Sequence, residues 1–403
     1  MVLGSHESIG DPRMTTTAAL NATPATSSDD PIDHRGSWIP TWGMITTRFM
    51  ELRRRRGLMI AIIVVVIGIP TIFLVVRLVA HAVDPKSYAP AGGYDIFTNL
   101  TAGVMFIFGF IMAAMLGCTA GSIDLTEGMF RHLVVTGRSR VALYFARIPA
   151  GLAIITSIVA IGFTIVCVVC CLAAPRTLHY NGVDVPAGLS SSAFDTYAAN
   201  HVSDVLCNFN FNGPSSVNVP CQYDRKTGKG VIGLGKGGTP PGFVMPSAQK
   251  LRSDAVVIAK QNYYAYSQEF LSPSTGLMVR TGLWLELEAA IGFIVGLGLG
   301  SLLGQRTVAV IIMLVYEVIL TPLLARAHIA HLINAQRGLV GLATAHLEPA
   351  ALPQVFGGGG NGPQGANVSG LIPESRMLAV CVIVGWIVVW TALGARRMAT
   401  RDA

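Results

Sequence analysis

The chain has 403 residues, of which 52% are hydrophobic and only 13% are charged. Soluble domains carry about 25% charged residues, so the composition excludes an ordinary soluble protein. The apolar residues gather in runs of about 18 residues or more, the length that an α-helix needs to cross a bilayer. The formal net charge of +7 is explained by arginines that flank such runs. No basic stripe with interleaved aromatic residues indicates nucleic-acid binding.

The N-terminal region divides into two parts. Residues 1–37 are rich in Thr, Ala, Ser, Asp and Pro and have no apolar period, which predicts a disordered cytoplasmic tail. Residues 38–56 predict an amphipathic elbow helix that lies in the membrane interface. Its apolar face would carry Trp38, Trp42, Ile45, Phe49 and Leu52, and its charge comes from Arg48 and Arg53 to Arg56. A plain basic stop before the first span is the alternative.

The remaining apolar runs predict an all-α polytopic membrane protein with six transmembrane helices. We expect these helices over residues 57–80, 99–120, 143–173, 281–303, 308–325 and 377–395, with a kink near Pro70 in the first. The first three fall in the block 57–173, the next two in 281–325, and the sixth with a cytoplasmic tail in 377–403. Arginine and lysine near the span ends favour a multi-pass protein with both termini cytoplasmic.

This topology predicts two long segments outside the cell. Residues 174–280 form a large extracytoplasmic insertion between helices 3 and 4, roughly 105 residues long, enough for a small folded domain. Cys207 and Cys221 lie there in a polar stretch, CNFNFNGPSSVNVPC, and in an oxidising compartment they predict a disulfide. Residues 326–376 predict extracytoplasmic surface helices followed by a Gly-rich linker.

The stretch TGKGVIGLGKGG, residues 227–238, contains two overlapping phosphate-binding patterns. A phosphate loop needs a strand before it and a helix after it. CQYDRKT precedes this stretch and TPPGF follows it, and Gly237 stands where a Walker A loop has Ser or Thr. We therefore interpret it as a flexible, solvated loop and expect no nucleotide site in this chain.

The segment between the second and third spans, residues 121–150, predicts a short cytoplasmic helix over 122–137. Ser122 or Asp124 could cap its start, and Gly137 could end it. It would carry an apolar ridge with Arg131 beside it, as in a docking element for another protein; the ridge consists of Leu125, Met129, Phe130 and Leu133. The candidate docking residues are Glu127, Gly128, Phe130, Arg131 and Leu133. An ordinary polar loop is the alternative, but it does not explain the apolar ridge.

At these residues the chain resembles the permeases of ABC-2 type exporters, on Glu127, Gly128, Arg131, Gly137 and the run Arg138-Ser139-Arg140. The order of parts is also similar: an interface helix, six spans, a coupling helix after span two, and re-entrant helices between spans five and six. The resemblance implies a transport subunit of the bacterial plasma membrane, without enzyme activity or a cofactor of its own. It also implies a second permease chain as homodimer or heterodimer, and two ATPase subunits that carry ATP and Mg²⁺. The 174–280 insertion departs from many members and leaves the substrate open.

Three acidic residues fall within apolar runs: Glu286 and Glu288 in the fourth span, and Glu317 in the fifth. Buried carboxylates are costly in lipid and usually face the interior of a helix bundle, so these residues are candidates for the translocation path. The alternative is a pair with Arg77, Arg280 or Arg326, or protonation. His328 and His331 could hold a metal, but we expect no metal site.

Two further interpretations remain open. The small residues of GLGLGSLLG, 296–304, would let helices approach closely, either toward a partner chain or within this one. The protein as a whole could instead be a non-transporting scaffold that displays its outer domain, or a membrane-embedded enzyme.

Overall fold

The computed structural model describes residues 38–84, 88, 90–126, 139–180, 183–208, 221–223, 229–233, 246–270, 272–326, 333–353 and 374–400. The tail predicted over 1–37 lies outside these residues.

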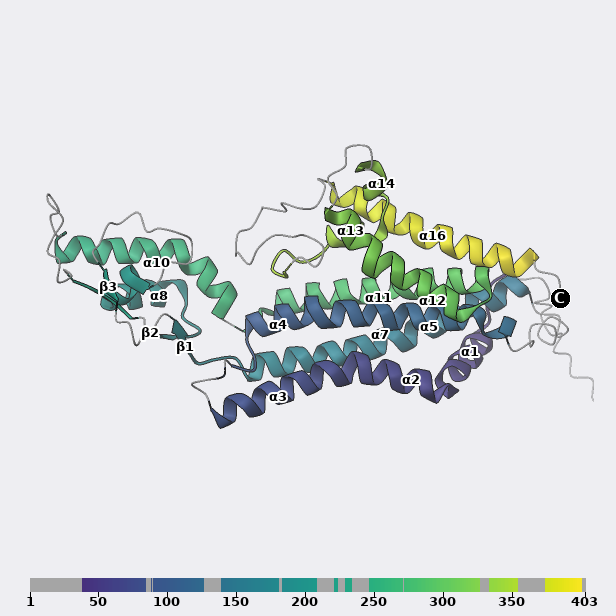
Figure 1. The fold of residues 1–403 in the computed structure, drawn as a ribbon, viewed down its shortest axis with the longest axis horizontal. Helices are drawn as coiled ribbons and strands as arrows, with labels where there is room; N and C mark the ends of the chain where they lie inside the picture. The colour runs from purple at the N-terminus through teal and green to yellow at the C-terminus, as the bar shows by residue number, and fades with distance from the viewer. Residues whose placement is uncertain are drawn as a thin grey trace, which may run out of the picture. The chain divides into compact units, whose positions relative to one another are not determined.

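Six helical segments are long and apolar enough to cross a membrane, as expected for an all-α multi-pass membrane protein (Figure 1). The first three are α2 (Arg56–Ile63), η1 (Val64–Gly68) and α3 (Ile69–Val83); α4 (Tyr94–Leu100), η2 (Thr101–Met105) and α5 (Phe106–Thr126); and α7 (Arg140–Leu172). The others are α11 (Thr275–Leu303); α12 (Arg306–Leu314), η3 (Val315–Leu320) and α13 (Thr321–Arg326); and α16 (Arg376–Thr400). Segments labelled η are single π-helical turns within longer helices.

Two of these π turns end just before a proline. Pro70 has no N–H to donate, and its ring would clash with the carbonyl of residue 66 in a regular helix. The turn η1 precedes it, and the Ile69 N–H bonds to the Val64 carbonyl five residues back. The turn η3 has the same relation to Pro322. A wider turn is a known way to accommodate such a break. Of the two turns, η1 lies where the sequence predicts a kink.

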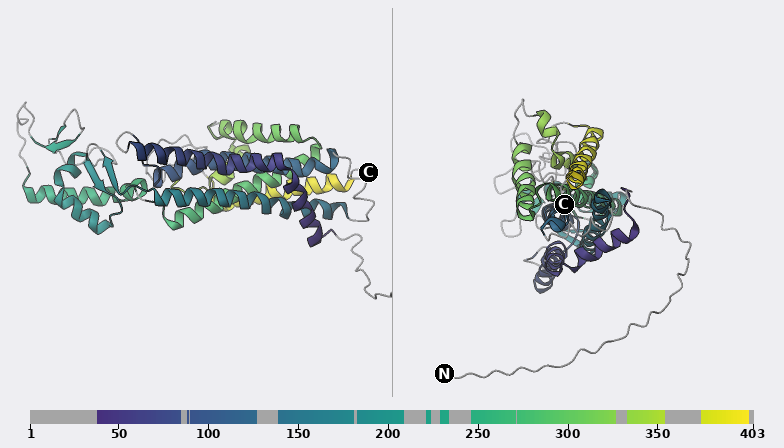
Figure 2. Two further views of the ribbon diagram at one scale, coloured as in Figure 1. Left: turned by 90° about the horizontal axis from the view of Figure 1, so that it is seen from below. Right: turned by 90° about the vertical axis from the view of Figure 1, so that its right-hand side faces the viewer.

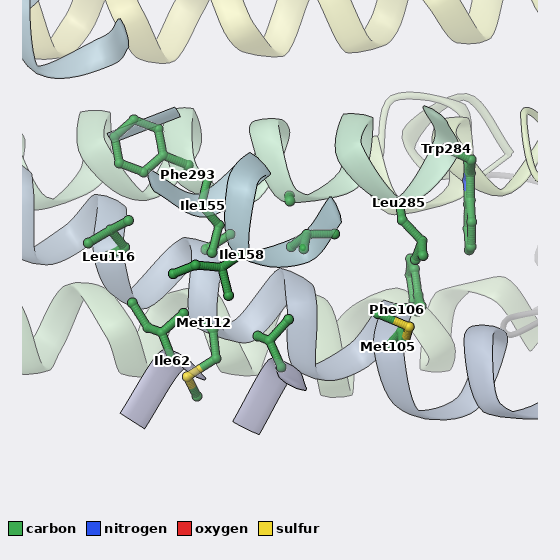
Figure 3. Close-up of a cluster of buried hydrophobic side chains, with 14 of the residues drawn as sticks. Ile62, Met105, Phe106, Met112, Leu116, Ile155, Ile158, Trp284, Leu285 and Phe293 are labelled. Carbon is green, nitrogen blue, oxygen red and sulfur yellow. The ribbon is translucent and has the colours of Figure 1, made fainter. Parts of the chain in front are cut away.

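The centre of the bundle is formed by α11 and α5. In their most apolar windows these two spans are 78% and 67% buried, against at most 33% for the other four. The buried side chains between them include Phe106, which stacks on Trp284 with ring centroids 5.0 Å apart, and Phe293, which is fully buried (Figure 3). The outer helices expose Val, Ile and Leu side chains, as lipid-facing helices do.

The small residues of α11 pack within the chain. A Cβ added at Gly296 would lie 2.6 Å from the Ala114 carbonyl oxygen of α5, and one at Gly298 would lie 2.6 Å from the Trp390 carbonyl oxygen of α16. Only glycine allows backbones to approach so closely. Of the two interpretations of this stripe, the structure therefore favours packing inside the chain.

The elbow helix is α1 (Trp42–Arg54), which packs against α7. Leu52 and Arg48 are buried, and the Arg48 guanidinium donates to the Glu51 carboxylate at 2.6 Å. Trp42 is exposed on the other side. In Figure 2 the purple helix α1 turns sharply away from α2; its position in the membrane interface stays a prediction.

The insertion between the third and fourth spans contains a small core of its own. Its elements are β1 (Thr177–Tyr180), β2 (Val183–Pro186), α8 (Ser191–Asn200), α9 (Val202–Asn208), β3 (Cys221–Tyr223), β4 (Gly230–Ile232) and α10 (Ala248–Phe270). The strands form two antiparallel pairs, β1 with β2 and β3 with β4. Phe194 of α8 stacks on Tyr266 of α10 at 4.3 Å. A disulfide joins Cys207 at the end of α9 to Cys221 of β3.

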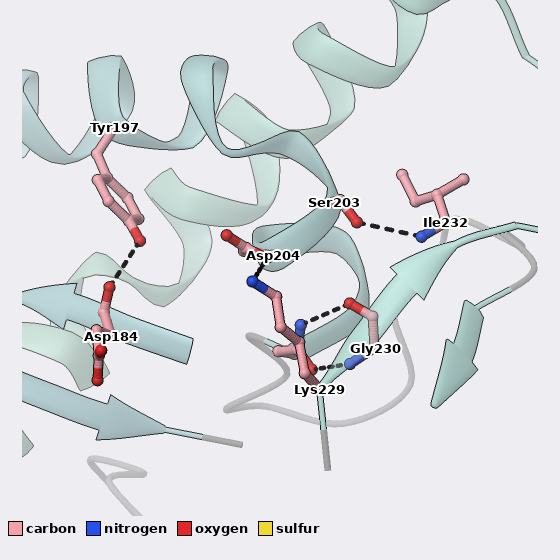
Figure 4. Close-up of polar contacts among 8 residues, drawn as sticks. Asp184, Tyr197, Ser203, Asp204, Lys229, Gly230 and Ile232 are labelled. Carbon is pink, nitrogen blue, oxygen red and sulfur yellow. Dashed lines mark hydrogen bonds and ion pairs between the residues drawn. The ribbon is translucent and has the colours of Figure 1, made fainter. Parts of the chain in front are cut away.

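The glycine-rich stretch that resembles a phosphate loop is in part a strand. Residues Gly230–Ile232 form β4, so this part differs from the flexible loop we expected. The Gly230 amide donates to the Asn208 side chain at 2.8 Å, and the Ile232 amide donates to the Ser203 hydroxyl at 3.1 Å. Lys229 lies 3.4 Å from the Asp204 carboxylate (Figure 4). These amides and this lysine are already bonded inside the insertion.

A candidate site of buried carboxylates

Two short helices lie between the fifth and sixth spans, α14 (Ile333–Arg337) and α15 (Val340–Ala345). Only Gln336 of α14 is buried, whereas all six residues of α15 lie inside the protein. Two tryptophans from different spans hold residues 338–345. The Trp386 indole donates to the Gly338 carbonyl at 2.7 Å, and the Trp284 indole donates to the Thr344 carbonyl at 3.2 Å. We call residues 338–345 the re-entrant segment.

The two tryptophans come from spans that pack on this segment. Trp284 follows the start of α11 by nine residues, and Trp386 follows the start of α16 by ten, so at 1.5 Å per residue both lie about 15 Å along their helices. Residues 340–345 are thus buried against two helices that are long and apolar enough to cross a membrane. Irregular backbone inside a membrane bundle is tolerated only where protein buries it or where it lines a cavity. The placement of 326–376 at the outer membrane surface stays a prediction.

Glu317 lies under the re-entrant segment, within the π turn η3. The side chain is 5% exposed, and the Thr321 hydroxyl lies within reach of its Oε2 at 3.4 Å and donates to the Tyr316 carbonyl at 3.1 Å. The backbone of Gly341 packs directly on the carboxylate: a Cβ there would lie 2.5 Å from Glu317 Oε1. A side chain at 341 would therefore have to displace the Glu317 carboxylate.

Glu288 reaches the same region from the neighbouring span α11. It lies one helical turn after Trp284 and is 2% exposed. Its carboxylate interacts with the Thr344 hydroxyl, and Glu317 and Glu348 are within electrostatic range. Thr344 also donates to the Gly341 carbonyl at 3.1 Å. The re-entrant segment therefore links the two carboxylates, one from each span.

Glu286 is not part of this group. It is two residues from Glu288, about 200° around the helix, and it is only half-buried. Neither of its oxygens has a hydrogen-bond partner among the described residues. Of the three acidic candidates, the structure thus brings together Glu288 and Glu317 alone.

Of the arginines considered as counter-ions, the two whose side chains are described do not pair with these carboxylates. Arg77 donates to the Pro90 carbonyl at 3.2 Å, Arg280 is exposed in the second turn of α11, and the Arg326 side chain is outside the described residues. Glu288 and Glu317 each keep one oxygen, Oε1, without a hydrogen-bond partner in the described part of the chain.

The predicted docking residues lie outside the described part of the chain. Residues 127–138 include all five of them: Glu127, Gly128, Phe130, Arg131 and Leu133. What is described just before them differs from our expectation. Helix α5 continues without a break through Thr126, and the Ser122 hydroxyl donates back to the Cys118 carbonyl at 2.9 Å. A serine bonded in this way is inside a helix, so no new helix begins at Ser122.

The histidines considered for metal binding, His328 and His331, are likewise outside the described residues. Within the described ranges, no group of three or more His, Cys, Asp or Glu could hold a metal ion.

Several residues of the site were not predicted from the sequence: Trp284, Thr321, Gly341 and Thr344. The available signal was weak. Gly338 and Gly341 stand in an apolar stretch that is too short to span a bilayer, which is also a pattern of a segment that enters the membrane without crossing it.

Comparison with protein-family models, with curated proteins and with solved structures finds no match. The functional argument therefore rests on the residues of this chain.

Proposed function

We propose that this chain is the membrane-spanning permease subunit of an ATP-binding-cassette exporter of the ABC-2 type, located in a bacterial plasma membrane with both termini cytoplasmic. It moves its substrate outward with energy from a separate ATPase. The proposal starts from the resemblance at residues 127–140 and from the order of the structural parts.

The observation that carries the proposal is the re-entrant segment seated on Glu288 and Glu317. A protein that only anchors an outer domain does not need a buried segment between its spans or acidic groups inside its helix bundle. Both features are costly in lipid and are typical of pathways for ions or substrates. Glu317 and Glu288 are then gate or pathway residues, and Glu286 contributes from a separate face of α11.

The partners follow from the same proposal. Two ATPase subunits bind the cytoplasmic segment that contains Glu127 and Arg131, and they hold ATP and Mg²⁺. A second permease chain, identical or related, completes the pathway. The insertion with the Cys207–Cys221 disulfide then lies outside the cell, where it meets the substrate or a further protein.

The test is purification of the full chain from its native host in mild detergent. We expect an ATPase to co-purify in stoichiometric amount, identified by mass spectrometry, with ATP hydrolysis in the complex. The double substitution Glu127→Ala and Arg131→Ala should lower the bound ATPase at least tenfold, because it removes both charged docking groups. Lys260→Ala is the matched control, since Lys260 is an exposed charge in the insertion, and it should leave the ATPase bound.

Absence of any ATPase from the wild-type preparation would contradict the permease proposal. It would leave the scaffold and the membrane-embedded enzyme as the remaining functions, with the insertion as the part to study next.

A further inference from the structure

We propose that Glu288 and Glu317 together bind one monovalent cation, a proton or Na⁺, beneath the re-entrant segment. This inference goes beyond the proposed function, because it concerns the isolated chain and holds whether or not an ATPase binds.

The first argument is uncompensated charge. Both side chains are more than nine-tenths buried, and each has one carboxylate oxygen without a hydrogen-bond partner among the described residues. No Lys, Arg or His of those residues forms an ion pair with either of them. Two ionised carboxylates close together in a dry interior repel each other, and each also loses its hydration. Glu348 adds a further negative group within range of Glu288. A bound cation removes this cost.

The second argument is the chemistry of the surrounding groups. Besides the carboxylates, the site offers the hydroxyl oxygens of Thr321 and Thr344, which keep their lone pairs because the hydroxyls donate their protons to the carbonyls of Tyr316 and Gly341. All of these are oxygen atoms, the ligands preferred by hard cations. They lie where a π turn and a short buried helix interrupt regular packing, the type of backbone that coordinates Na⁺ or H⁺ near the membrane midplane.

The third argument is size. The Gly341 backbone closes one side of the Glu317 carboxylate, since a Cβ there would lie 2.5 Å from Oε1 and 2.8 Å from the Thr321 methyl carbon. The gap between the Gly341 backbone and the carboxylate is therefore too small for a methyl group. The described residues also lack the three-ligand group expected for a metal such as Zn²⁺. A proton or a single Na⁺ fits these limits.

Among the described residues, the titratable groups in electrostatic range of the two carboxylates are Glu348, by its range to Glu288, and Tyr316, which is adjacent to Glu317. Both are neutral or negative, so neither supplies the missing positive charge.

Two measurements on the purified full chain distinguish the two cations. The first is equilibrium binding of radioactive ²²Na⁺ in a choline buffer. If Na⁺ is the ligand, we expect saturable binding of one ion per chain, with an affinity that falls as the pH is lowered because protons compete. The second is infrared difference spectroscopy in Na⁺-free buffer. If a proton is the ligand, we expect the band of a protonated carboxyl group, which disappears on raising the pH.

The variants Glu288→Gln and Glu317→Gln should each lower Na⁺ affinity at least 100-fold, or remove the carboxyl band. Asp95→Asn is the control, because Asp95 is an exposed carboxylate in the first turn of α4, and it should leave binding and the band unchanged.

Wild-type protein that binds no Na⁺ and shows no protonated carboxyl would overturn the inference, and this result does not depend on whether any variant folds. Loss of binding in Asp95→Asn to the same extent as in Glu317→Gln would also overturn it. Neither result bears on the co-purification of an ATPase, so the two proposals can fail separately.

Discussion

Substitution of Gly296 by alanine tests the packing of the two central helices. The added methyl carbon would lie 2.6 Å from the Ala114 carbonyl oxygen, 3.2 Å from the Ala114 Cα and 3.2 Å from the Cys118 amide nitrogen. These are backbone atoms of α5, so no side chain can rotate away. A normal contact distance is about 3.5 Å, and the two helices must therefore separate by ~1 Å.

The expected cost follows from two opposing terms. Overpacking of this kind destabilises by about 1–3 kcal/mol, while alanine gains about 0.5–1 kcal/mol over glycine as a helix former. We expect a net loss of about 1–2 kcal/mol. Gly109→Ala in α5 is the control, because a Cβ there meets nothing within 4 Å, and it should be neutral or slightly stabilising.

The assay combines unfolding with thiol labelling. Denaturant unfolding in mild detergent gives the loss of stability, and maleimide labelling followed by peptide mass spectrometry reports on Cys118, which is fully buried between the two helices. In Gly296→Ala, Cys118 should label faster than in wild type or in Gly109→Ala. If Gly296→Ala unfolds with the wild-type midpoint and Cys118 stays protected, the described contact between α5 and α11 is incorrect.

Two predictions concern the insertion, and proteolysis of the full chain tests both. Replacement of Cys207 and Cys221 by serine opens a loop with a sequence separation of 14 residues, and this should lower the stability of the insertion by about 3 kcal/mol. Subtilisin cleavage of the insertion should then be about 100-fold faster. Reductant should increase the cleavage of wild type and leave the cleavage of the double variant unchanged. Burial raises the pKa of the Tyr266 phenol, so its contribution to stability is complete below the unfolded value near 10 and is lost as the pH rises through the folded value. Tyr266→Phe removes the hydrogen bond to the Pro186 carbonyl at 2.6 Å, which should lower stability by about 1 kcal/mol at neutral pH. Above about pH 10, the stability of this variant should fall less steeply with pH than the stability of wild type. An equal alkaline loss of stability in both proteins would contradict this role of Tyr266.

Much of the fold could be predicted because the membrane imposes a simple rule on the chain. Each span must be an apolar run of sufficient length, and the six predicted runs all lie within the six observed helical segments or overlap them closely. Errors arose at the ends. Helix α11 begins at Thr275, six residues before the predicted start. The prediction missed these first turns because they contain Arg280 and other residues that are not typical of a lipid-facing run. Helix α5 continues past the predicted end at residue 120, and the Ser122 hydroxyl donates to the Cys118 carbonyl within this helix.

The candidate site could be predicted only in part. Glu288 and Glu317 are conspicuous as charges in apolar runs, but so is Glu286, and periodicity alone does not separate them. Glu288 is distinguished from Glu286 only by the face of α11 that contacts α15, and that contact joins residues more than fifty positions apart in the sequence.

The sequence by itself determined that this is a helical multi-pass membrane protein, where its spans lie, and that three carboxylates are within them, because hydrophobic length and charge are properties of local stretches. Only the tertiary structure decided that residues 338–345 enter the bundle, that Gly341 packs on Glu317, and that the glycine stripe of α11 faces α5 and α16 of the same chain. These features depend on close approach between distant segments. The backbones approach closely because glycine has no side chain. The sequence shows where each glycine is, but it does not show which segment packs against it.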